Sequence, residues 1–127
     1  MKTQLAIFRA ILVLHALGVL TQSVFAGQFL SGSDSAVVFH EVTGWCVAAL
    51  GLLQTASVLT LLKHHHGGLW LVVGSFFLLI GEALQLGTGY GRFLNVHIPL
   101  AIVILAGLVG MMALAFRHKK RIADLRS

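Results

Sequence analysis

Four long apolar runs dominate the sequence. A hydrocarbon core of about 30 Å is crossed by about 20 apolar residues in a helix, and inside it the backbone polar groups must pair with one another. With 57% hydrophobic and only 10% charged residues, the chain cannot cover a water-soluble domain with polar side chains. We therefore predict an all-α protein, a single transmembrane four-helix domain over residues 1–127 that is joined up-down-up-down by short connections. The predicted helices are Leu5–Ala26, Val37–Leu62, Leu69–Leu86 and Leu94–Phe116.

Basic residues gather at one end of the predicted bundle. Lys2 precedes the first helix and Arg9 lies in its first turns. "LKHHHGG" joins the second helix to the third, and "RHKKRIADLR" follows the fourth, whereas the other two connections hold one Arg and one Asp. Because Lys and Arg in short loops stay on the cytoplasmic side, we expect a multi-pass protein of the cytoplasmic membrane with both termini in the cytoplasm. The net charge of +5 then reflects topology and contact with the lipid bilayer, and we expect no nucleic acid partner.

The first apolar run imitates a secretory signal, because small residues follow it at "SVFAG". The run is longer than a typical signal core and contains Arg9 and His15. We therefore expect no cleavage. The three histidines of "HHH" at 64–66 fit a polar cytoplasmic loop better than a metal site.

An internal repeat links the two halves of the chain. The pattern Q-x3-G-x7-H occurs at Gln28–His40 and again at Gln85–His97, 57 residues later. Two matched hairpins predict a pseudo-two-fold axis along the membrane normal. The repeat places His40 and His97 at the same depth, near the outer starts of the second and fourth helices. Because these helices are diagonal in such a bundle, we expect both side chains to point at its axis from opposite sides.

A pair of facing imidazoles in a membrane suits the axial ligation of haem iron. The second nitrogen of each ring stays free to donate to a carbonyl or a side chain. Zinc sites require three or four protein ligands, and the single cysteine, Cys46, adds none at this level. We predict that one haem b per chain is bound by His40 and His97.

Residues around this pair suit a flat macrocycle. Gly44 lies one turn from His40, and Gly87 belongs to a group of glycines, with Gly89 and Gly91, where a ring can approach the backbone. Trp45 and Phe93 are expected to cover the faces of the ring. Tyr90 and Arg92 are expected to bind the propionates, since arginine forms charge-assisted hydrogen bonds with carboxylates. An aromatic belt and an ordinary loop are the alternative interpretations.

The segment "LQLGTGYGRFLNVHIPLA" resembles the region between the third and fourth helices of the haem A synthase family. Members of that family contain two four-helix halves, each with histidines on its second and fourth helices, and this chain is similar to one half. The resemblance implies that His40 and His97 are axial ligands, and Gln85 and Gly87 match the motif. The Glu-x-x-His pattern of the catalytic half is missing, because Val37 lies three residues before His40.

These features predict a b-type cytochrome. With both axial positions filled by protein, electron transfer to or from a quinol or a redox protein is favoured over catalysis at the iron. Two alternatives remain open. The chain could be a short haem A synthase-like enzyme that acts as a homo-oligomer or in a larger complex, or it could be a cofactor-free structural or transporter-like subunit.

Further polar residues lie inside the predicted spans. His15 is in mid-membrane, and its counterpart in the repeat is Val72. We expect it to hydrogen-bond a neighbouring helix; a proton, quinol or second-haem role is the alternative. We expect Glu82 to face the bundle, where hydrogen bonding to a haem ligand, proton relay and pairing with a His or Gln remain open. We expect Gln22 and Gln54 to form hydrogen bonds between helices. The glycines of "ALGLL" and "LAGLVG" predict close helix contacts.

Overall fold

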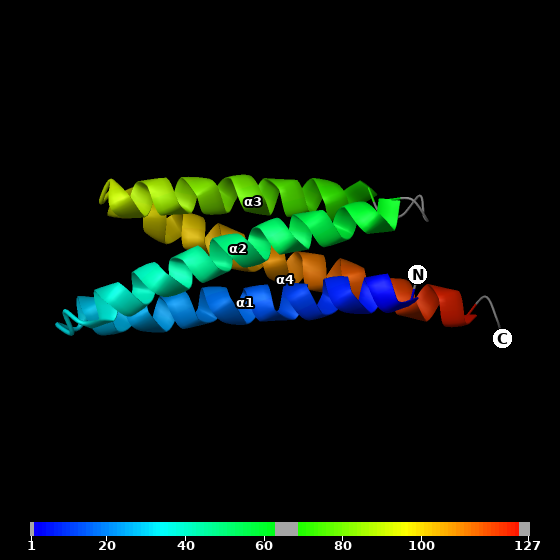
Figure 1. Ribbon diagram of the computed structural model, residues 1–127, viewed down its shortest axis with the longest axis horizontal. Helices are drawn as coiled ribbons and strands as arrows, with labels where there is room; N and C mark the ends of the chain where they lie inside the picture. The colour runs from blue at the N-terminus through cyan, green and yellow to red at the C-terminus, as the bar shows by residue number, and fades with distance from the viewer. Residues whose placement is uncertain (1, 63–68, 125–127) are drawn as a thin grey trace.

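Four helices make up the part of the protein that the structure describes (Figure 1). The computed structural model describes residues 2–62 and 69–124, with side chains for 3–62 and 69–117. No β-strand occurs in these residues, so the all-helical prediction is confirmed. All four helices are long and apolar enough to cross a membrane, as predicted. The histidines at 64–66 lie outside the described residues. The helices are α1 (Lys2–Leu30), α2 (Ala36–Leu62), α3 (Leu69–Tyr90) and α4 (Leu94–Asp124).

The helices form a ring with two diagonals. α1 packs against α2 and α4, and α3 packs against the same two helices, so that α1 faces α3 and α2 faces α4 across the axis. Figure 1 shows the start of α1 and the end of α4 at one end of the bundle, which we call the terminal end. The turns 31–35 and 91–93 lie at the opposite end, which we call the loop end.

α1 and α3 extend four residues past the apolar runs that predict them, to Leu30 and Tyr90. Each helix then closes with the same pattern of backbone hydrogen bonds. After α1, the backbone N–H of Gly32 donates to the carbonyl of Phe29, and that of Ser33 donates to the carbonyl of Gln28. After α3, Arg92 donates in the same way to Gly89, and Phe93 donates to Thr88. This is the Schellman motif, which needs a left-handed residue after the helix. Gly32 adopts a φ of 96°, whereas the equivalent Arg92 has a φ of 56°.

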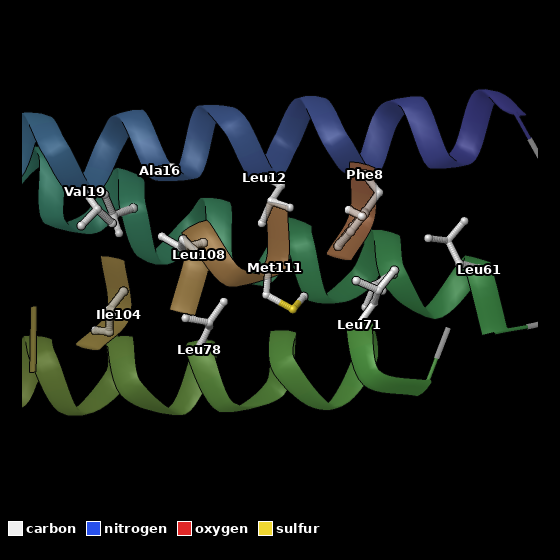
Figure 2. Close-up of a cluster of buried hydrophobic side chains, with 13 residues drawn as sticks. Phe8, Leu12, Ala16, Val19, Leu61, Leu71, Leu78, Ile104, Leu108 and Met111 are labelled. Atoms are coloured by element: carbon white, nitrogen blue, oxygen red, sulfur yellow. The ribbon is translucent and has the colours of Figure 1, made fainter. Parts of the chain in front are cut away.

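Aliphatic side chains from all four helices fill the interior (Figure 2). Phe8 and Leu12 of α1 and Leu108 of α4 are fully buried. Large apolar side chains also point outward on every helix; Phe77 is 71% exposed and Ile102 is 66% exposed. Such a surface suits lipid. Inside a bilayer, close van der Waals packing and hydrogen bonds between helices hold the bundle together.

Two of the helix glycines make room for side chains of the neighbouring helix. A Cβ atom on Gly107 of α4 would lie 2.9 Å from Cδ2 of Leu78. A Cβ atom on Gly51 of α2 would collide with the carboxylate of Glu82. The glycine in "ALGLL" therefore accommodates a polar group as well as permitting close packing.

Candidate functional site

His40 of α2 and His97 of α4 face each other across one diagonal near the loop end. Their ring centroids are 6.1 Å apart, and the ring planes meet at 65°. Both side chains are partly buried. The structure thus brings together, from residues 57 positions apart in the sequence, the two rings that the repeat places at one level.

A backbone carbonyl orients each ring. Nδ1 of His40 lies 3.1 Å from the carbonyl oxygen of Gln22, and Nδ1 of His97 lies 2.9 Å from that of Gln85. Because a carbonyl only accepts, each Nδ1 carries the hydrogen. In a neutral imidazole this leaves the lone pair on Nε2 free, which is the form that binds a metal. In the neutral form, both rings therefore carry their free lone pair on Nε2.

The carbonyl partners reveal a different register from that of the sequence repeat. The pattern aligns Gln28 with Gln85, but the glutamine that supports His40 is Gln22. Likewise, the aligned glycines differ: Gly32 ends α1 with a positive φ, whereas Gly89 lies within α3. The reason is that α1 continues further past Gln22, to Leu30, than α3 continues past Gln85, to Tyr90.

Small residues and one amide pack beside the rings. A Cβ atom on Gly89 would lie 3.0 Å from Cε1 and 3.2 Å from Nδ1 of His97. On the other hairpin, the side-chain nitrogen of Gln22 donates to the carbonyl of His40 at 2.8 Å. The same nitrogen lies 2.8 Å from the Cβ position of Gly44, and Leu86 lies 3.7 Å from it. Gln22 and Leu86 thus occupy the space beside Gly44.

The other predicted site residues are distributed around the loop end. Trp45 donates through Nε1 to the Tyr90 hydroxyl at 3.1 Å, and that hydroxyl donates to Oε1 of Glu41 at 2.6 Å. This exposed chain ties α2 to α3 on the outside of the bundle. Arg92 lies exposed in the turn after α3, and the Cβ position of Gly87 faces open space. Of these predicted site residues, Trp45 and Tyr90 are thus joined by a hydrogen bond.

Gln85 contributes twice. Its carbonyl accepts from His97, and its side-chain oxygen Oε1 is buried without a hydrogen-bond donor among the described residues. An unpartnered buried polar atom is costly, which makes it a candidate contact for a bound group. In the part of the chain that the structure describes, no three His, Cys, Asp or Glu side chains gather as a metal site. The histidine pair therefore offers two nitrogen ligands.

A second polar cluster lies on the bundle axis, at mid-length. His15 of α1 is fully buried; its Nδ1 lies 2.8 Å from Oε1 of Gln54 and its Nε2 lies 2.8 Å from Oε1 of Glu82. Gln54 also donates to Ser75 of α3 at 3.2 Å. The expected interhelical hydrogen bonds of His15 and Gln54 are confirmed, and Glu82 faces the interior as expected.

The pairing of His15 with Glu82 was not predicted. The repeat compares His15 with Val72, but the structure sets it opposite a residue ten positions further along α3 (82 − 72 = 10). In the structure, His15 is 13 residues after the start of α1 and Glu82 is 13 after the start of α3 (15 − 2 and 82 − 69), which places them at equal depth. The apolar run that predicts the first helix begins only at Leu5, so the sequence did not reveal this match.

The architecture places the chain in a broad class, the small all-helical proteins with four candidate membrane spans. Comparison with known proteins adds no family to this class, since no family model, curated protein or solved structure matches the chain. The resemblance to haem A synthase stays a prediction.

Proposed function

We propose that the protein is a b-type cytochrome of the cytoplasmic membrane. In this proposal the chain spans the membrane up-down-up-down, with the terminal end in the cytoplasm and one haem near the outer loop end. His40 and His97 would ligate its iron through Nε2. The observation that carries the proposal is the 6.1 Å separation of the two rings, each held with its Nδ1 on a backbone carbonyl.

The separation of the rings agrees with a shared metal. An imidazole binds a metal at about 2 Å, and its ring centre lies about 1 Å behind the bonding nitrogen, so two opposed ligands have ring centres about 6 Å apart. The observed 6.1 Å matches this value. Two neutral imidazoles are also the donor set that fits low-spin haem iron.

The surroundings of the pair fit a macrocycle with one local rearrangement. Gly89 lets the ring of His97 lie directly against α3, and Oε1 of Gln85 is a buried atom that needs a partner. The Gln22 and Leu86 side chains, which lie beside Gly44, would turn aside to admit a flat group. Both are flexible side chains, which supports this local rearrangement.

Electron transfer is the activity that this arrangement supports. A haem held there supplies one-electron transfer between ferric and ferrous iron. His40 and His97 would both bind the iron, which would leave no open position for oxygen or substrate. Arg92, exposed in the outer turn, offers a guanidinium to the propionates. A membrane quinol or a redox protein at the outer face would be the partner.

The test is the visible spectrum of the purified protein with and without each ligand. We expect split, sharp bands on dithionite reduction, and loss or conversion of these bands in His40→Ala and in His97→Ala. Asn95→Ala, which changes an exposed residue of α4 two positions before His97, should keep the wild-type bands. Extraction and mass analysis should recover unmodified haem b, whereas a modified haem would favour the synthase-like enzyme. A colourless protein from haem-replete cells would favour the cofactor-free subunit.

A further inference from the structure

The buried pair of His15 and Glu82 is a second axial feature, on the other diagonal. His15 is 0% and Glu82 3% exposed, and they reach across the axis from α1 and α3. Along α1, His15 lies seven residues from Gln22, and along α3, Glu82 lies seven residues from Gly89. Seven residues of helix rise about 10.5 Å, or two turns. The pair therefore lies two turns inward of the histidines near the loop end.

The hydrogen bonds require a proton inside this pair. Gln54 donates its amide nitrogen to Ser75, which turns its oxygen toward Nδ1 of His15 at 2.8 Å. Nδ1 must then carry a hydrogen, and Nε2 of a neutral ring is a bare acceptor. The facing oxygen of an ionised Glu82 is also an acceptor. Their contact at 2.8 Å needs one proton between them, on the nitrogen or on the oxygen.

A purely structural role does not account for a carboxyl at this position. The second oxygen of Glu82, Oε2, lies against Gly51 and accepts no hydrogen bond from the described residues. Removing a carboxylate from water is costly unless its oxygens are satisfied. An amide would join the helices without that cost. Ionisable groups kept inside membranes commonly serve proton transfer.

The other groups around the pair leave its charge to vary. α2 presents Gln54 and Thr55, and α3 presents Ser75, all uncharged. On α1 the nearest charged group is Arg9, six residues away and bonded to the carbonyl of Ala115. Toward the loop end, the exposed Cys46 is the nearest titratable group on α2, followed by Glu41 and His40, and His97 is the nearest on α4. No described fixed charge neutralises the pair, so its charge is set by its own protons.

We propose that His15 and Glu82 form an internal proton-binding site. The pair already shares one proton at its 2.8 Å contact, and it takes up a second, on Oε2 of Glu82, when one electron enters the site between His40 and His97. The electron comes from the external donor and the proton from water, so that the charge inside the bundle is unchanged. The link to the electron rests on the proposed function, whereas the proton site itself does not.

Infrared spectroscopy of the full chain in lipid nanodiscs tests the proton site, whether or not haem is present. We expect a carboxylic acid band that titrates with pH and shifts in D₂O. Glu82→Gln, which preserves the shape of the side chain, should remove it. Glu41→Gln, which changes an exposed carboxyl at the loop end, should retain it. Identical carboxyl bands in the wild type and Glu82→Gln at every pH would overturn the proposal. His15→Gln should displace the titration of the same band, as a check that does not alter the carboxyl.

Redox titration tests the link. In the pH range in which the infrared band titrates, the reduction potential of the haem should fall by up to about 59 mV per pH unit, the value for one proton per electron. Glu82→Gln should flatten this slope and Glu41→Gln should keep it. Equal slopes in the wild type and Glu82→Gln would disprove the link, even with the haem bands present. A protein without haem bands would instead contradict the proposed function, and the infrared result would still decide the proton site.

Discussion

At the scale of single residues, glycines decide where the polar side chains can lie. Gly89 lies under the ring of His97, and Gly51 lies under the carboxylate of Glu82. In both places a hydrogen atom in place of a side chain lets a polar group approach a helix backbone. The positions of these two glycines therefore shape the two axial pairs.

Substitution of Gly89 should disturb the ligand. Gly89→Val places a branched side chain against the ring of His97, so we expect haem affinity to fall by about tenfold or more, equivalent to about 1.4 kcal/mol. Gly27→Val is the matched control, because the Cβ position of this residue, in α1 near the loop end, has nothing within 4 Å. Haem titration of both variants measures the effect. Equal affinities would show that the ring does not depend on Gly89.

Substitution of Gly51 should destabilise the bundle. In Gly51→Ala the new methyl group overlaps the Glu82 carboxylate, so the free energy of unfolding should fall by about 1–3 kcal/mol, the usual cost of overpacking. At Gly110 of α4 nothing lies near the Cβ position, so Gly110→Ala should be neutral or gain up to about 1 kcal/mol of helix propensity. Unfolding in sodium dodecyl sulphate, followed by circular dichroism, compares the two. Equal losses would contradict the assigned role of Gly51.

At the scale of the elements, the apolar runs were sufficient to predict four helices, but they did not predict where α1 and α3 end. Both helices continue through polar residues such as Gln28 and Thr88, because backbone pairing and the turn decide the end. The two histidines could be placed at one level since each follows a turn at a similar distance. The His15–Glu82 pair could not, because it joins diagonal helices whose relative register depends on the full lengths of the hairpins.

The two turns at the loop end predict opposite mutational effects. A left-handed conformation costs a residue other than glycine about 1–2 kcal/mol. Arg92→Gly should therefore raise the free energy of unfolding of the haem-free protein by about 1 kcal/mol, and Gly32→Ala should lower it by a similar amount. Chemical unfolding of both variants checks the signs. Changes of the same sign would show that the turns are not equivalent caps.

At the scale of the whole molecule, the bundle has two ends of different chemistry. The helix ends at the terminal end adjoin the basic segments of the sequence, whereas the loop end carries the turns and the histidine pair. This polarity predicts the orientation in the membrane. Along the bundle, the His40–His97 pair lies nearer the loop end than the His15–Glu82 pair, so the predicted orientation would put the histidine pair on the outer side.

Thiol labelling of intact cells tests the orientation. In a Cys46→Ser background, Ser33→Cys at the loop end should react with a membrane-impermeant reagent, because we expect this end outside. Arg117→Cys at the terminal end should react only after the membrane is permeabilised. The reverse pattern would place the histidine pair on the cytoplasmic side and contradict the proposed topology.

The central claim is that His40 and His97 hold one haem between them. The most direct measurement is the dithionite-reduced visible spectrum of the wild type, recorded beside His40→Ala and His97→Ala. We predict sharp, split low-spin bands in the wild type that each substitution abolishes or converts. A wild type that is colourless when purified from haem-replete cells, or bands that persist unchanged in both variants, would contradict the claim.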